Sequence, residues 1–144
     1  MKSPGALAAL LAISLTASAV ELTAADGGTF AVLDRQQAPT QIYYPLSLKD
    51  GKWLMEGKQA GAPWTDLSCE TGCEYRASTD AEVQAHVPSA WRERADFTCI
   101  RNVAQAFCRY SAKGNTAAAP NYVVIALVTG QPVPLFVRRT VSAP

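Results

Sequence analysis

The sequence has little of what catalytic and nucleic-acid-binding proteins usually depend on. It contains one histidine, and its 13 basic and 12 acidic side chains leave a formal net charge of only +1. A balance this even provides no field of one sign that would attract nucleic acid or an anionic membrane. We therefore expect no nucleic acid among the partners of this protein.

Motifs that mark common active sites and ligand sites are also missing. The 144 residues contain no C-x-x-C redox pair, G-x-S-x-G elbow, H-E-x-x-H zinc motif, phosphate-binding loop or D-x-D-x-D-G calcium loop. His86 falls at the end of a predicted helix, where a histidine is favoured by the helix dipole without any catalytic role. The sequence predicts no catalytic residue, no metal site and no cofactor, and we expect that the protein is not an enzyme.

Long apolar runs are scarce, and the first one has the features of a secretory signal peptide. A basic start at Lys2 precedes an uncharged apolar run over residues 5–17, and Ala17-Ser18-Ala19 provides the small residues of a cleavage site. The run is short for a hydrocarbon layer of about 30 Å, although an anchor helix remains an alternative. We predict a periplasmic or secreted protein with a signal peptide at 1–19, a flexible leader at 20–28, one domain at 29–144, and no stable membrane insertion after cleavage.

Cysteine usage agrees with export. An even number of cysteines in a small exported chain predicts disulfides, and this chain has four: Cys69, Cys73, Cys99 and Cys108. The first two are separated by a three-residue, glycine-containing loop of the kind that closes a hairpin. Asn102 resembles a helix start, so that an extended Cys99 could fold back onto a helix that carries Cys108. We favour the pairs Cys69–Cys73 and Cys99–Cys108, and the two crossed pairings remain open.

Turn signals separate several short segments that favour strands. The Asp50-Gly51 turn predicts a hairpin of residues 41–48 and 52–56, with Pro45 at an edge or a bulge. Residues 64–68 and 74–77 are expected to be the arms around the cysteine loop. Residues 121–129 are almost all apolar, which predicts a strand buried on both faces, and residues 133–141 are its expected partner.

Helical signals gather between the predicted hairpins. Thr79 and Glu82 form a capping box that begins a helix, Pro88 ends it, and residues 89–95 allow a second short turn. The three- and four-residue spacing of apolar residues up to Cys108 predicts a further helix from about residue 103. The expected fold class is α+β: an antiparallel sheet of about five to seven short strands, one to three short helices and two disulfides.

The residue types that dominate protein interfaces supply the candidates for function. Tyr, Trp and Arg are enriched at binding hot spots, and carboxylates surround the cysteine loop. The candidate interface residues are Tyr44, Trp64, Glu70, Glu74, Trp91 and Arg92. We expect a binding protein that acts on another protein, in the form of an inhibitor or immunity-type factor for an envelope enzyme or a secreted toxin, because stiff loops lose little entropy on binding.

Two other classes of function remain open from the sequence. Asp66, Glu70 and Glu74 could serve a small hydrolase of cell-wall or glycan material, since a pair of carboxylates hydrolyses glycosides without a histidine. The third class is a structural protein of the cell envelope. No motif in the sequence resembles one whose function can be carried across to this chain.

Overall fold

Antiparallel strands make up most of the chain that the computed structural model describes, which covers residues 21–59, 65–66, 74–115, 119–128 and 130–140. The elements follow one another as η1 (Ala24–Asp26), β1 (Gly28–Leu33), β2 (Pro39–Lys49), β3 (Lys52–Gln59), β4 (Thr65–Asp66), β5 (Arg76–Ala77), α1 (Asp80–His86), α2 (Ser89–Arg92), β6 (Ala95–Arg101), β7 (Gln105–Ala112), β8 (Asn121–Ala126) and β9 (Val133–Arg139). No helix in this part of the chain is long and apolar enough to cross a membrane.

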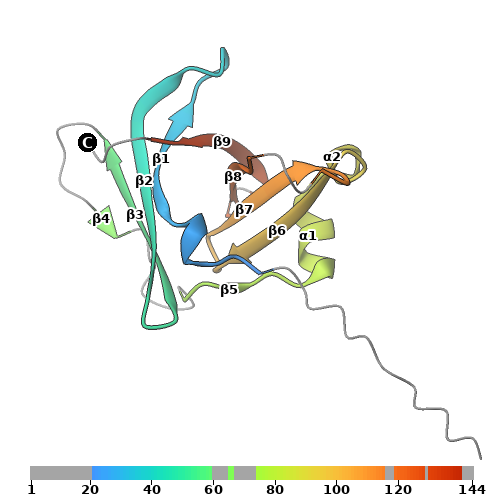
Figure 1. The fold of residues 1–144 in the computed structure, drawn as a ribbon, viewed down its shortest axis with the longest axis horizontal. Coiled ribbons are helices and arrows are strands. Elements are labelled where there is room, and N and C mark those ends of the chain that lie inside the picture. Colours follow the sequence, from blue (N-terminus) through green and yellow to red (C-terminus); the bar gives the residue numbers. More distant parts are fainter. Residues whose placement is uncertain (1–20, 60–64, 67–73, 116–118, 129, 141–144) are drawn as a thin grey trace, which may run out of the picture.

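The strands form one continuous sheet that curls into a nearly closed barrel (Figure 1). Their order is β4-β3-β2-β1-β9-β8-β7-β6-β5, and every neighbouring pair is antiparallel. The prediction of an α+β fold with five to seven strands is therefore wrong. The described residues form a β-rich fold with nine strands, of which β4 and β5 have two residues each, and two short α-helices.

One of the additional strands comes from the segment that we predicted to be a third helix. Residues 105–112 form β7, which is paired with β6 on one side and β8 on the other. Asn102 does use its side chain as a cap would, because its Oδ1 accepts hydrogen bonds from the backbone N–H groups of Ala104 and Gln105. Here those bonds hold a hairpin turn, which is the other structure that an asparagine at such a position favours.

The hairpin places the cysteines opposite each other. Cys99 of β6 pairs in register with Cys108 of β7, and their Cα atoms are 4.1 Å apart. The two residues form a disulfide, as the sequence predicted, but by pairing across two strands and not by a strand folding onto a helix. The other predicted bridge, Cys69–Cys73, lies outside the described residues.

Other local predictions are confirmed. Asp50 and Gly51 both have positive φ (51° and 74°), the combination required by the tight turn that joins β2 and β3. The capping box is present at the start of α1, where Thr79 Oγ1 accepts from the N–H of Glu82 and the carboxylate of Glu82 accepts from the N–H of Thr79. The short second helix is α2.

The order of the strands in the sheet contradicts two predictions, one about the arms of the cysteine loop and one about Pro45. The segments around the cysteine loop do not pair with each other, because β4 adds to β3 and β5 adds to β6 at opposite ends of the strand order. Pro45 is not at an edge, since β2 lies between β1 and β3. The β2–β3 register is the same on both sides of Pro45, at Tyr43↔Lys58 and Leu46↔Met55, but Pro45 itself has no partner in β3, so the strand tolerates a residue that has no N–H.

Side chains that point into the barrel form the main core. The rings of Phe30, Phe107 and Tyr122 are in mutual contact, with centroids 4.9–5.4 Å apart, and they are joined by Leu46, Met55, Ile100, Val124 and Val137. Phe30 meets the other two rings edge to face and Phe107 stacks on Tyr122, and both arrangements are favourable beyond the apolar area they bury. The core thus draws on strands that span most of the sequence.

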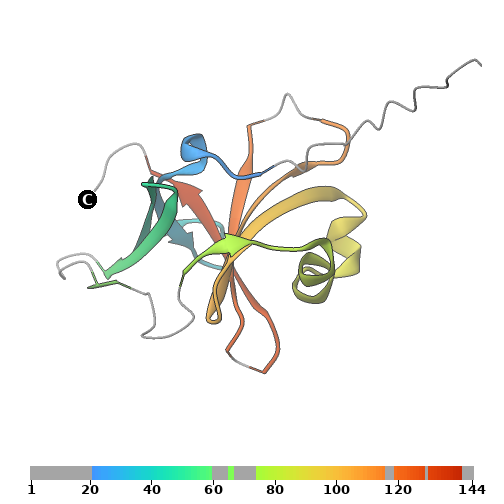
Figure 2. The ribbon, with the colours of Figure 1, turned by 90° about the horizontal axis from the view of Figure 1, so that it is seen from below.

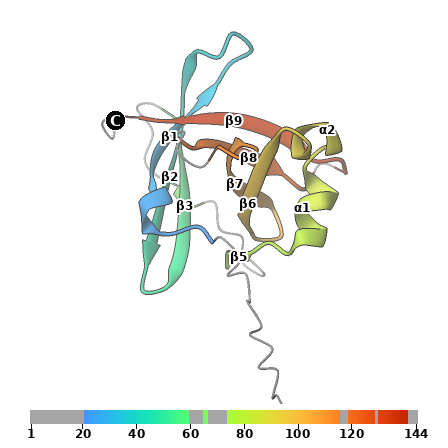
Figure 3. The ribbon, with the colours of Figure 1, turned by 45° about the vertical axis from the view of Figure 1, so that its right-hand side comes forward.

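A second core lies outside the barrel, under the two helices. Alternate residues of the same strands, among them Cys99, Cys108, Val123 and Ile125, pack there with Val87 of the segment that joins α1 to α2. Figure 3 shows both helices on the outer side of β6. Because β8 contributes to both cores, its residues Tyr122 to Ile125 are all buried, as the apolar run predicted.

Residues 21–27, which the sequence predicts to be a flexible leader, pack against the barrel. Leu22 joins the main core, and Asp26 of η1 is only 3% exposed. The Asp26 carboxylate accepts hydrogen bonds from the Arg109 guanidinium at 2.8 Å and from the Tyr122 hydroxyl at 3.0 Å. Arg139 lies over the Tyr122 ring and donates to the Ala25 carbonyl, so a buried polar network fastens this segment.

Candidate functional site

A groove lies where the helix layer ends and the β8–β9 hairpin begins. Residues 84–89, 91, 92, 125, 132 and 134 line it, and its volume is about 380 Å³, within the usual range for ligand sites. We call it the helix–hairpin groove. Its floor consists of Val87 and Ile125, which are 2% and 1% exposed, and the exposed prolines Pro132 and Pro134 form one wall.

The groove exists because the helices cover only part of the outer core. Trp91 of α2 is half-buried and its ring packs on Phe136 of β9 with centroids 5.4 Å apart. Helix α2 has only four residues, and Val133 and Pro134, which precede Phe136 in β9, are exposed. β9 pairs with β1 only from Val137 to Arg139, and the β8–β9 hairpin extends beyond the rest of the barrel (Figure 2).

Arg92 provides the only permanent charge among the lining residues, none of which is an acid. Its Nε donates a hydrogen bond of 3.1 Å to the carbonyl of Val87, at the end of α1. Its terminal nitrogens make no hydrogen bond or ion pair with any other described residue. The guanidinium is therefore held in place, and its two terminal nitrogens remain available to donate a pair of hydrogen bonds to one carboxylate.

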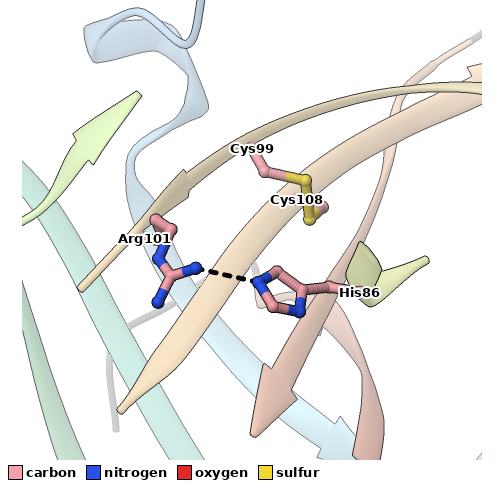
Figure 4. The surroundings of a disulfide bond; sticks show 4 residues. All are labelled: His86, Cys99, Arg101 and Cys108. Atoms are coloured by element: carbon pink, nitrogen blue, oxygen red, sulfur yellow. Dashed lines mark hydrogen bonds between the residues drawn. A yellow bond between two sulfur atoms is a disulfide. The ribbon is translucent and has the colours of Figure 1, made fainter. Parts of the chain in front are cut away.

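His86 lines the same groove and belongs to a charged cluster behind it. Glu82 forms a two-point ion pair with Arg76, at 2.6 and 2.7 Å, and a contact of 2.9 Å with Arg101. The guanidinium of Arg101 also points toward the His86 ring, with 2.8 Å between Nη1 and Nε2 (Figure 4). The hydrogen bond and charge of Arg76, together with the backbone N–H of Thr79, hold the pKa of Glu82 well below its usual range.

The neighbours of His86 fix its protonation state. An arginine can only donate, so Nε2 of His86 accepts the bond from Arg101 and the proton of the neutral ring is on Nδ1. Burial, and secondarily the charge of Arg101, lower the pKa of His86. Nδ1 is buried and has no hydrogen-bond partner. These contacts show a neutral histidine that orients Arg101 on the side of the hairpin that carries the disulfide (Figure 4).

A larger cleft, of about 560 Å³, lies at the seam of the barrel between β3 and β5–β6. Trp53, Tyr75 and Phe97 contribute aromatic surface, and the Tyr75 hydroxyl accepts a hydrogen bond of 2.6 Å from Gln105. The lining includes both acids and a base, and that base, Arg76, is already paired with Glu82. Residues 67–73, which connect the strands on either side of this seam, are outside the described part of the chain.

The structure brings two of the six predicted interface residues together. Trp91 and Arg92 line the helix–hairpin groove. Tyr44 packs against the main core, and burial raises the pKa of its hydroxyl. Glu74 is 87% exposed in its side chain and faces Lys52 at 3.4 Å. Trp64 and Glu70 are outside the described residues.

The sequence does not indicate the remaining groove residues. Pro134 lies in the part of β9 that has no partner on the β1 side, a place that suits a residue without an N–H. The apolar run of β8 is the one sequence feature that points toward the site, because a strand buried on both faces must have a second layer over its outer face. Nothing in the sequence says where that layer stops.

No group of three or more histidine, cysteine, aspartate or glutamate side chains that could hold a metal ion is found within the described ranges. We find no match to this chain among protein families, curated proteins or solved structures.

Proposed function

We propose that this chain is an exported protein that acts by binding another protein. In its most concrete form it is an inhibitor or immunity-type factor for an envelope enzyme or a secreted toxin. The N-terminal pattern of residues 1–19 supports export to the periplasm or the medium. The Cys99–Cys108 disulfide supports it as well, because such bonds persist in oxidising compartments.

The observation that carries this proposal is the helix–hairpin groove on a stiff frame. Its floor belongs to the outer core, next to the disulfide-bonded hairpin. Trp91 and Arg92 are residue types that dominate binding energies at interfaces, and both have fixed contacts inside the protein, to Phe136 and Val87. Side chains that are already ordered lose little freedom when a partner binds.

The experiment is affinity capture by the folded mature protein. Immobilised protein is exposed to an envelope extract and to the culture medium of the producing cells, and the same protein immobilised in its unfolded state controls for adhesion to apolar segments. We expect one partner retained at a stoichiometry near one to one. If the partner is an enzyme, its activity should fall in proportion to the complex formed. A folded monomer that retains no partner from either source would refute the proposal.

A further inference from the structure

Three features of the helix–hairpin groove point to the chemistry of what it binds. The first is the apolar floor and walls: Val87, Trp91, Ile125, Pro132 and Pro134 surround a space that suits one large apolar side chain. Pro132 and Pro134 remove two backbone donors from this stretch, so an added β-strand would lack partners there. This stretch is therefore a poor template for an added strand, which favours an occupant that binds through its side chains.

The second feature is the charge at the rim. Arg92 is cationic, no lining residue is anionic, and no ion pair within the described residues includes Arg92, so nothing in this part of the chain compensates its charge beside the apolar floor. The other arginines near α1 differ in this respect. Arg76 and Arg101 are both paired with Glu82. Arg92 thus has the free donors for an external acid.

The third feature is the fixed position of that charge. The bond from Arg92 Nε to the Val87 carbonyl holds the guanidinium next to the floor residue Val87. A carboxylate that binds the terminal nitrogens would therefore lie within a residue or two of a side chain on the floor. Paired hydrogen bonds between arginine and a carboxylate are short and directional, and they select for this arrangement.

We propose that the groove receives a segment of the partner protein in which an aspartate or glutamate side chain adjoins a large apolar side chain. The apolar side chain occupies the floor over Val87 and Ile125, and the carboxylate pairs with Arg92. This inference rests on the proposed function and names the class of protein segment that the site recognises.

Short peptides of defined sequence test the inference on the intact mature protein. The probes are N-acetylated, C-amidated octapeptides Gly-Ser-Gly-Phe-Glu-Gly-Ser-Gly, their twins with glutamine in place of glutamate, and the corresponding pair with leucine in place of phenylalanine. Isotope-labelled protein reports binding through the backbone signals of Val87 and Ile125 and the indole N–H of Trp91. We expect the glutamate peptides to shift these signals and to bind roughly tenfold more tightly than their glutamine twins.

Variants separate the charge from the shape of the groove. Arg92→Gln should bring the two kinds of peptide to equal affinity. Ser89→Glu should do the same, because it places an acid beside Arg92 at the start of α2, where an acid favours the helix. Arg94→Gln is the matched control, since Arg94 is exposed and lies outside the groove, and it should keep the full difference.

Three outcomes would overturn the inference. They are the absence of shifts at the groove with about 5 mM of any probe, equal binding of the glutamate and glutamine peptides by the unaltered protein, and an unchanged preference in Arg92→Gln. The proposed function fails differently, through the lack of any captured partner. If the mature protein captures a partner and Arg92→Gln captures it equally well, the groove assignment fails while the proposed function stands.

Discussion

The buried network around Asp26 gives the sharpest prediction about stability. The residue is 3% exposed, and its carboxylate accepts from Arg109, Tyr122 and the backbone N–H of Thr23 at 2.8–3.0 Å. Replacing Asp26 with asparagine keeps the shape but removes the charge that balances the largely buried Arg109 guanidinium. Breaking a buried pair on one side costs about 3–5 kcal/mol. We expect a loss near the lower end, about 3 kcal/mol, because the amide oxygen can still accept one of these bonds.

Urea unfolding followed by tryptophan fluorescence measures this loss. At this chain length it corresponds to a fall of about 10 °C in the thermal midpoint. A double-mutant cycle with Arg109→Gln should give a coupling of at least about 1 kcal/mol, since the two charges are in direct contact. Glu74→Gln is the control, because the Lys52–Glu74 pair is exposed and its loss should leave the unfolding free energy unchanged within error. A loss below about 1 kcal/mol for Asp26→Asn, or additive single effects, would refute the reasoning.

Three further predictions concern stability. Replacing Cys99 and Cys108 together by alanine should lower the unfolding free energy by about 2–3 kcal/mol, because the bridge closes a short loop; an unchanged urea midpoint would contradict this. Leu22→Ala should lower the unfolding free energy by about 2–4 kcal/mol in the same assay, since Leu22 is in the main core. A negligible change would show that residues 21–27 do not contribute to the stability of the fold. Burial and the charge of Arg101 lower the pKa of His86 in the folded protein. As the pH falls below about 6.5, the imidazole therefore becomes protonated in the unfolded chain before it does in the folded protein, which favours unfolding. The thermal midpoint should drop between about pH 7 and pH 5.5. His86→Gln should flatten that part of the profile, and equal slopes in both proteins would exclude the mechanism.

Local signals in the sequence predicted local structure well. The Asp50-Gly51 turn, the capping box at Thr79 and the apolar run of β8 each depend on a few neighbouring residues, and each is present in the structure. The Cys99–Cys108 pair was favoured from the cysteine count and spacing, with the two crossed pairings left open, and the structure contains it. These features require no knowledge of what packs against them.

The prediction of the fold class was wrong because one pattern of apolar residues fits both a helix and a pair of strands. The apolar spacing from Phe97 to Cys108 suits a helix, but the same residues alternate between the inner and the outer core in β6 and β7. Asn102 supports a helix start or a turn equally well, and the long-range pairing of β7 with β8 decides between them. Composition also gives no sign that Leu22 and Asp26, within the predicted leader, are buried, because small residues surround them.

Only the helix residues of the candidate site could be predicted from the sequence. Trp91 and Arg92 have residue types that favour interfaces and stand next to each other in the sequence. Their neighbours in the groove, Ile125 and Pro134, come from strands more than thirty residues away, and the extent of the uncovered face depends on the four-residue length of α2. Tyr44, in contrast, has a favourable residue type but packs against the main core.

Site-specific cross-linking in the producing cells tests most directly that this protein binds a partner through the helix–hairpin groove. A photoreactive amino acid at the groove residue Ser89 is compared with one at Gln41, which is exposed on β2 and does not line the groove. We predict a single protein adduct from position 89 and none from position 41. No adduct from position 89, or the same adducts from both positions, would contradict the account.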